Sequence, residues 1–103
     1  MPPVTRVRIV GPSMAPAMLN DEWWLVRRTS TPRAGEVALI VHPRRPDLLI
    51  VKRLARRETG GWWVLGDNPE ASEDSRQFGA VPDANVLGRL WWRYRPLRRS
   101  SAD

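Results

Sequence analysis

Residues 48–65 read Leu-Leu-Ile-Val-Lys-Arg-Leu-Ala-Arg-Arg-Glu-Thr-Gly-Gly-Trp-Trp-Val-Leu, two apolar runs on either side of a short turn. The turn at residues 58–61 favours a β-hairpin whose strands are residues 48–57 and 62–65. In the first strand, side chains alternate between two faces, so Lys52 shares its face with aliphatic neighbours. Those neighbours are Leu48, Ile50 and Leu54. The stretch therefore predicts an antiparallel pair that carries a lysine in an apolar setting.

The rest of the chain also favours strands separated by turns. Alternating or β-branched stretches predict strands at residues 6–10, 23–26, 36–42 and 86–95. Two prolines in residues 43–47 predict a connecting turn, because proline cannot donate to a sheet ladder. The many turn formers of residues 66–79 predict a polar, functional loop without regular structure. No amphipathic helix is evident, so the expected class is mainly β, a single small domain of antiparallel strands.

The length of 103 residues suits one domain, residues 1–103, with one modest core. We expect the core to span about residues 6–95, with flexible tails at residues 1–5 and 96–103. No apolar run approaches the roughly 20 residues that a membrane-spanning helix needs, and no signal-peptide pattern opens the sequence. The sequence therefore favours a soluble, cytoplasmic protein.

The chain contains no cysteine and one histidine, His42. These counts exclude disulfides, iron–sulfur clusters and thiol catalysis, and they argue against a zinc site. We therefore expect no metal and no cofactor, and any hydrolysis should be metal-free.

The net charge of +6 raises another function class, binding to nucleic acid or to an anionic membrane. Trp91, Trp92 and Tyr94 alternate with arginines, as a stacking surface for single strands requires. A plain strand explains the same alternation, so contact of these rings with a membrane stays open. Lys52 is the only lysine among seventeen basic residues, and lysine is the cationic side chain that can lose its proton when buried.

Residues 11–16, Gly-Pro-Ser-Met-Ala-Pro, hold Ser13 in a rigid stretch directly after a predicted strand. Such a serine can be a nucleophile, although an ordinary turn explains the stretch as well. Nothing around His42 marks it as the base of a triad. Lys52 is the better partner if burial lowers its pKa by ~3 units from about 10.4, and a snorkelling lysine is the alternative.

Four separated stretches resemble the motif boxes of the signal peptidase I family of serine-lysine proteases. Residues 11–16 resemble its nucleophile box Ser-Met-x-Pro, and residues 20–26 resemble the following Gly-Asp-x-Val-x-Val strand. Residues 51–53 resemble the base-bearing box. Residues 66–79 reproduce the loop Gly-Asp-Asn-x-x-x-Ser-x-Asp-Ser-Arg-x-x-Gly. The resemblance covers most of residues 7–89 and implies a signal peptidase I/LexA-like catalytic core without membrane anchor or second domain.

The resemblance also implies a role for each matching residue. Ser13 would be the nucleophile, Lys52 the general base, and Ser72 a hydroxyl that orients the lysine amine. Asp74 and Arg76 would brace the loop, whereas a surface salt bridge of little worth is the alternative for that pair. The remaining supporting residues of the box are Gly66, Asp67 and Asn68.

The oxyanion hole needs donors that are positioned before charge develops, and the backbone N–H of Ser13 is the natural one. Some family members place a serine two residues before the nucleophile as second donor. Gly11 occupies that position here, so the second donor stays unassigned.

Three stretches are similar to those of the proteases that mature nickel-type superoxide dismutase: Gly-Pro-Ser-Met-Ala-Pro, Gly-Trp-Trp-Val-x-Gly-Asp-Asn-Pro and Ser-x-Asp-Ser-Arg-x-Phe-Gly. This resemblance implies that the partner is a nickel superoxide dismutase precursor, whose N-terminal propeptide is removed so that the nickel site can form. Two alternatives remain, a soluble signal-peptidase-like protease with another substrate and a non-enzymatic basic β module. Only the last would bind nucleic acid or anionic lipid.

Overall fold

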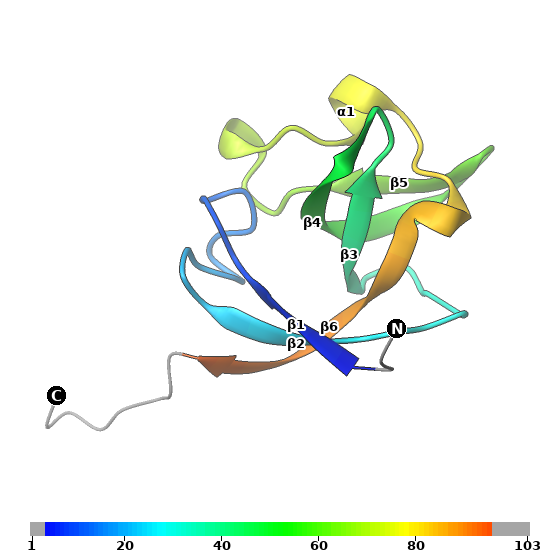
Figure 1. The fold of residues 1–103 in the computed structure, drawn as a ribbon. Helices are drawn as coiled ribbons and strands as arrows, with labels where there is room; N and C mark the ends of the chain where they lie inside the picture. The colour runs from blue at the N-terminus through cyan, green and yellow to red at the C-terminus, as the bar shows by residue number, and fades with distance from the viewer. Residues whose placement is uncertain (1–3, 96–103) are drawn as a thin grey trace, which may run out of the picture.

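Six antiparallel strands make up one sheet in the computed structural model, which describes residues 4–95 (Figure 1). Their order across the sheet is β1-β2-β6-β3-β4-β5. The bounds are β1 Val4–Arg8, β2 Trp23–Arg27, β3 Val37–His42, β4 Arg45–Glu58, β5 Gly61–Leu65 and β6 Val86–Arg95. The predicted mainly β class is confirmed. The tails expected at residues 96–103 and in the first three residues lie outside the described residues.

The sheet encloses two apolar clusters, and β3 contributes to both. Ala38 and Ile40 pack in one cluster with Leu54 and Val64, while Leu39 packs in the other with residues of the N-terminal half. Residues 37–40 are all buried, as expected for a strand with both faces covered. β6 pairs with β2 on one side and β3 on the other, so it joins the two halves seen in Figure 1.

The first strand differs from the prediction in its bounds. β1 begins at Val4, which pairs with Arg27, and ends at Arg8, which pairs with Trp23. Thr5 was expected in a flexible tail, and it belongs to the strand because β2 extends far enough to pair with it. Ile9 follows the strand and still hydrogen-bonds the backbone before β2, so the predicted strand was placed two residues too late.

The turn predicted at residues 43–47 is shorter in the structure. His42 pairs with Arg45, so the turn is only Pro43-Arg44, and the next regular pair is Val41 with Leu49. Pro46 therefore lies in strand β4, within an irregularity that leaves residues 46–48 without cross-strand partners. The expectation that both prolines end the ladder was wrong, because a bulge needs no N–H from the residue that it leaves unpaired.

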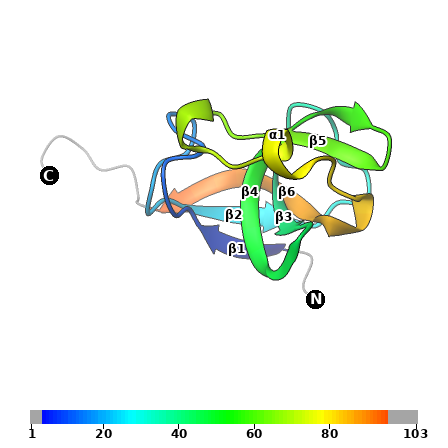
Figure 2. The ribbon, with the colours of Figure 1, turned by 90° about the horizontal axis from the view of Figure 1, so that it is seen from above.

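The loop at residues 66–79 contains regular structure, contrary to the prediction. It forms the 3-10 turn η1, Pro69–Ala71, and the short helix α1, Ser75–Phe78, and a second turn η2, Asp83–Asn85, precedes β6. A capping box starts α1: Asp74 accepts from the N–H of Arg76, and Gln77 accepts from the N–H of Asp74. This Asp-x-x-Gln pattern was readable in the sequence. Seen from above, α1 lies over the centre of the molecule (Figure 2).

Candidate active site

Ser13 and Lys52 line the same cavity, which has a volume of about 310 Å³. Its other walls are mainly aliphatic and come from β1 and the residues after it, from β4, and from Leu39 of β3. Ser13 is half-buried at the start of the loop between β1 and β2. Among the described residues, no hydrogen bond joins Ser13 Oγ to Lys52 Nζ. The fold thus brings the two side chains to one apolar hollow although 39 residues separate them in sequence.

The side chain of Lys52 is buried, with 5% of the residue exposed. It lies opposite Ala38 in the β3–β4 ladder, on the face that also carries buried Leu54. Burial lowers the pKa of Lys52, because desolvation disfavours the charged amine, while the charges of Asp74 and Glu73 oppose this effect. The neutral amine is therefore easier to form here than in water, which is what a lysine base requires.

Gly66 brings Ser13 and Ser72 close together. A Cβ at this position would lie 2.0 Å from Ser72 Oγ, 2.5 Å from Ser72 Cβ and 2.8 Å from the carbonyl oxygen of Ser13. The residue is buried and does not adopt a positive φ, so the need for glycine here is a matter of space. The carbonyl of the candidate nucleophile and the candidate orienting hydroxyl thus both border the space that a Cβ at Gly66 would occupy.

The next two residues of the motif fix the nucleophile loop. The backbone N–H of Asn68 donates to the carbonyl of Ser13 at 2.8 Å, and its side-chain amide donates to the carbonyl of Pro12 at 3.1 Å. The N–H of Asp67 points to the sulfur of Met14 at 3.4 Å. Three consecutive residues of one loop are therefore held by two residues that lie more than fifty positions later in the chain.

Asp67 is itself anchored by Arg53 of β4. The guanidinium donates from Nε to Oδ1 at 2.8 Å and from Nη2 to Oδ2 at 2.7 Å, a bidentate pair. A third bond from Nη1 reaches the carbonyl of Gly35 at 2.8 Å. Arg53 follows Lys52 directly, so β4 places the candidate base on one face and this anchor on the other. Sequence reasoning gave Arg53 no role.

Asp74 is fully buried and accepts hydrogen bonds from several elements. Its Oδ2 accepts from the N–H of Gly66 at 2.9 Å, from Ser72 Oγ at 3.3 Å and from Arg76 Nη2 at 2.8 Å, and its Oδ1 accepts from Arg76 Nε at 2.9 Å. Burial would raise the pKa of Asp74, but the bonds from Arg76 and Gly66 outweigh it and lower that pKa. The ionised carboxylate therefore ties Ser72 to the end of β5.

The sequence offered no signal for Glu22, a buried acid beside the nucleophile loop. One carboxylate oxygen accepts from the N–H of Leu19 at 3.0 Å and from the indole of Trp24 at 3.2 Å. The other accepts from Arg93 at 3.3 Å. Glu22 thus fastens the end of the loop to β2 and β6, yet its sequence context is that of an ordinary turn acid.

The structure also bears on the oxyanion donors. The N–H of Gly11 donates to the side chain of Asn20 at 2.8 Å, and Pro12 has no N–H to offer. These two residues therefore supply no second backbone donor. Within residues 4–95, the N–H of Ser13 makes no hydrogen bond.

Two further observations concern the described part of the chain as a whole. Nowhere in residues 4–95 do three His, Cys, Asp or Glu side chains converge as a metal ion would need. Over the same residues, no helix has the length and apolar character to cross a bilayer.

Comparison with known proteins finds relatives among membrane proteases and signal peptidases. Mitochondrial inner membrane protease subunit 1 of Xenopus tropicalis is 32% identical over 84% of the chain, which spans only 66% of that protein. Subunit 1b of the mitochondrial ATP-independent inner membrane protease of Arabidopsis thaliana is 28% identical over 85% of the chain and 68% of its own length. Signal peptidase IB of Staphylococcus aureus is 42% identical over 37% of the chain and 20% of its own length. Residues 2–90 match the Peptidase S24-like family, and the chain therefore belongs to it.

Proposed function

We propose that this protein is a serine endopeptidase in which Ser13 attacks the scissile carbonyl and Lys52 takes the proton of its hydroxyl. The observation that carries the proposal is the burial of the only lysine in the cavity that Ser13 lines, with its pKa lowered by desolvation. A neutral amine in such a site is a general base, and the protonated amine can then give its proton to the leaving nitrogen. Water hydrolyses the resulting acyl-enzyme by the same route.

The surrounding contacts suit this chemistry. Ser72 lies against Gly66 together with Ser13, and Asp74 holds its hydroxyl, so Ser72 can orient the amine of Lys52 as it approaches Ser13. The unpaired N–H of Ser13 can donate to the oxyanion as the tetrahedral intermediate forms. In these roles Ser13 and Lys52 are the catalytic residues, while Ser72 and Asp74 position them.

The shape of the site favours an extended peptide as substrate. β1 is an edge strand of the sheet, and residues 7–10, at its end and just after it, line the cavity. A substrate strand can pair with such an edge through main-chain hydrogen bonds, with alternate side chains directed into the aliphatic hollow. A helical segment has no free main-chain groups for this pairing, so it should be cut poorly.

For the specific substrate we propose the precursor of nickel superoxide dismutase, processed in the cytoplasm. Support comes from the resemblance of three stretches to the proteases that mature this enzyme, and two of them, residues 11–16 and 61–69, meet at the candidate site. Removal of the propeptide would free the N-terminal amine and histidine that the nickel site requires. A protease of the same mechanism with another substrate is the alternative.

The test combines the precursor with purified protein and reads the products by mass spectrometry. We expect one cleavage that leaves histidine at the new N-terminus, with secretory preproteins left intact. Ser13→Ala and Lys52→Arg should each abolish cleavage while the domain stays folded by circular dichroism, because arginine keeps the charge but does not act as a base near neutral pH. Activity that survives in Lys52→Arg would refute the dyad. An uncut precursor that gains full activity with nickel alone would refute the substrate.

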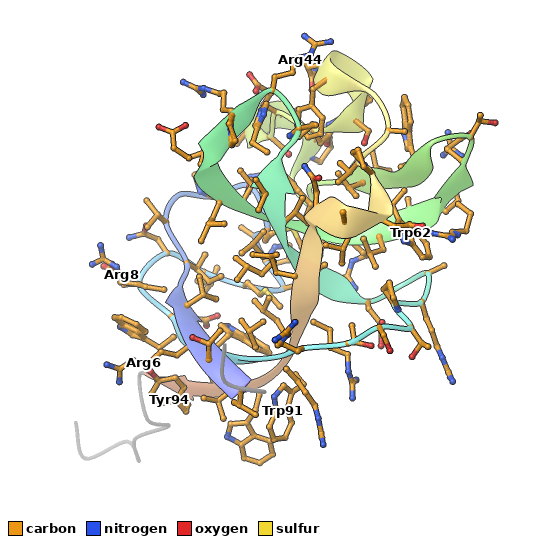
Figure 3. The ribbon with its side chains drawn as sticks, turned by 45° about the vertical axis from the view of Figure 1, so that its right-hand side comes forward. Arg6, Arg8, Arg44, Trp62, Trp91 and Tyr94 are labelled. Atoms are coloured by element: carbon orange, nitrogen blue, oxygen red, sulfur yellow. The ribbon has the colours of Figure 1, made fainter. Side chains whose placement is uncertain are left out.

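One observation favours a non-enzymatic function, binding to nucleic acid or anionic lipid. Trp91 and Trp92 are 41% and 58% exposed, and the guanidinium of Arg27 lies 6.0 Å from the centre of the Trp91 ring. Figure 3 shows Trp91, Tyr94 and Arg6 along one side of the molecule. Salt-dependent binding of single-stranded DNA or anionic vesicles by Ser13→Ala, without any peptidase activity in the wild type, would support this reading.

A further inference from the structure

The loop that carries Ser13 is closed at its end by the side chain of Glu22. The backbone N–H of Leu19 donates to Glu22 Oε1 at 3.0 Å, and the backbone N–H of Glu22 donates to the carbonyl of Leu19 at 3.1 Å. The first bond has the spacing of a capping box, in which a glutamate or glutamine side chain accepts from the backbone N–H three positions earlier. Only 7% of Glu22 is exposed, so little water competes for its carboxylate.

Two strands of the sheet bind the same carboxylate. The indole Nε1 of Trp24 in β2 donates to Glu22 Oε1 at 3.2 Å, and Arg93 Nη1 in β6 donates to Glu22 Oε2 at 3.3 Å. Trp24 and Arg93 are cross-strand partners. Figure 1 shows the start of β2 beside the end of β6, below the loop between β1 and β2. Glu22 thus connects the end of this loop to the β2–β6 part of the sheet.

Backbone contacts extend this attachment to Ser13. Met18, directly before Leu19, donates its N–H to the carbonyl of Met14 at 2.9 Å, and Met14 follows Ser13 in the chain. Both methionines are buried in the same apolar cluster as Ile9. Because a packed core transmits displacement, a shift of Leu19 would move Met14 and, with it, Ser13.

We propose that Glu22 is a positioning residue for the reaction, which fixes Ser13 in the cavity that it shares with Lys52. This inference rests on the proposed peptidase function. Asp67 and Asn68 contact residues 12–14 from the loop after β5, whereas Glu22 contacts the other end of the nucleophile loop from β2 and β6. With both attachments the loop is fixed at two ends; without Glu22 its second end is free to shift.

Two substitutions separate this role from an ion pair that serves stability alone. Glu22→Gln keeps an oxygen that Leu19 can donate to but loses the charge, whereas Glu22→Asp keeps the charge and shortens the side chain. In steady-state assays on the cleaved precursor, we expect Glu22→Gln to keep kcat within about threefold and Glu22→Asp to lower kcat about 10- to 100-fold, with KM nearly unchanged. A pair that served stability alone would leave both variants with the wild-type kcat in their folded fraction.

Glu36 provides a matched control in the same chain. Its carboxylate accepts from the backbone N–H of Arg33, again three positions earlier, at 2.8 Å, and lies 3.5 Å from Arg89 of β6. Glu36 does not line the cavity, so Glu36→Asp should lose stability and keep both kcat and KM.

Hydrogen exchange tests the positioning without a peptidase assay. The amide of Met18 should exchange about 10-fold faster in Glu22→Asp than in the wild type, relative to the amides of β3, because its bond to Met14 opens locally. In Glu22→Gln and Glu36→Asp its relative exchange rate should stay at the wild-type value.

Three results would overturn the inference: a wild-type kcat in Glu22→Asp, an equal loss of kcat in Glu22→Gln, or Met18 exchange that rises no more than that of β3. Failure of the proposed function would appear differently, as cleavage that persists in Ser13→Ala.

Discussion

Adding one methyl group at Gly66 is the sharpest test of how the site is built. In Gly66→Ala the new Cβ would lie 2.0 Å from Ser72 Oγ and 2.8 Å from the carbonyl of Ser13. Rotation of Ser72 moves its Oγ but not its Cβ, which would lie 2.5 Å away, so the backbone at Ser72 must shift as well. The contact with Ser13 also involves backbone, so the loop must move by about 0.6 Å to reach an ordinary contact. A shift of this size disturbs the 2.8 Å bond from the N–H of Asn68 to Ser13.

Displacement of a nucleophile by about 1 Å costs roughly 10²-fold in rate, so we expect Gly66→Ala to lower kcat/KM by about 10- to 100-fold. Overpacking should also cost about 1–3 kcal/mol of unfolding free energy. Initial rates on the cleaved substrate, with urea unfolding alongside, measure both. Gly88→Ala is the control, because its Cβ would lie 2.6 Å from the carbonyl oxygen of Arg27 in the sheet and Gly88 does not line the cavity. Gly88→Ala should lose stability and keep the rate of its folded fraction. A Gly66→Ala protein with wild-type kcat/KM would refute the role of this close contact.

Three further predictions concern single side chains. Ser72→Ala should lower kcat, but its loss should be smaller than that of Ser13→Ala by a factor of about 10 or more, because both reacting groups remain. Equal losses in steady-state assays would show that the roles are misassigned. Lys52→Met should be inactive, and urea unfolding at pH 7 should show it about 1–2 kcal/mol more stable than the wild type. Because the folded-state pKa of Lys52 is lowered, the free-energy cost of burying its amine falls as pH rises toward the unfolded-state pKa of 10.5. The stability advantage of Lys52→Met should shrink over the same range. Asp74→Asn should lower the free energy of unfolding by about 1–3 kcal/mol at pH 7. Since the folded-state pKa of Asp74 lies below 3.8, the difference in stability between wild type and variant should shrink only as pH falls below that value, which unfolding curves would show.

Much of the fold was predictable because its signals are local. The alternation of residues 48–57 and the Gly-Gly turn predicted the hairpin of β4 and β5, and the structure pairs Glu58 with Gly61 around it. The bulge after Pro43-Arg44 was not predictable, because proline forbids a ladder bond without indicating whether the chain bulges or turns. The extension of β1 to Val4 depends on the length of its partner strand, which no local pattern encodes.

The candidate site was predictable for a different reason. Ser13, Lys52 and Ser72 were assigned by resemblance to a family; in the structure Ser13 and Lys52 line one cavity, and Ser13 and Ser72 both lie close to Gly66. The contributions of Glu22 and Arg53 were missed because they depend on partners distant in sequence. An acid in a turn and an arginine in a strand look like surface residues until the fold supplies those partners.

Strand β6, which follows the other five described strands in the chain, occupies an interior position in the sheet. β6 lies between β2 and β3 in the sheet. The β1–β2 pair carries the loop of Ser13, and strands β3–β5 carry Lys52. These two parts are therefore not joined in one sheet until residues 86–95 are in place. Sheets closed by such long-range pairing fold late, since most of the chain must be present before the pairing stabilises anything. A chain that still lacks β6 therefore holds Ser13 and Lys52 on separate halves. The proposed peptidase activity should appear only once β6 has joined them.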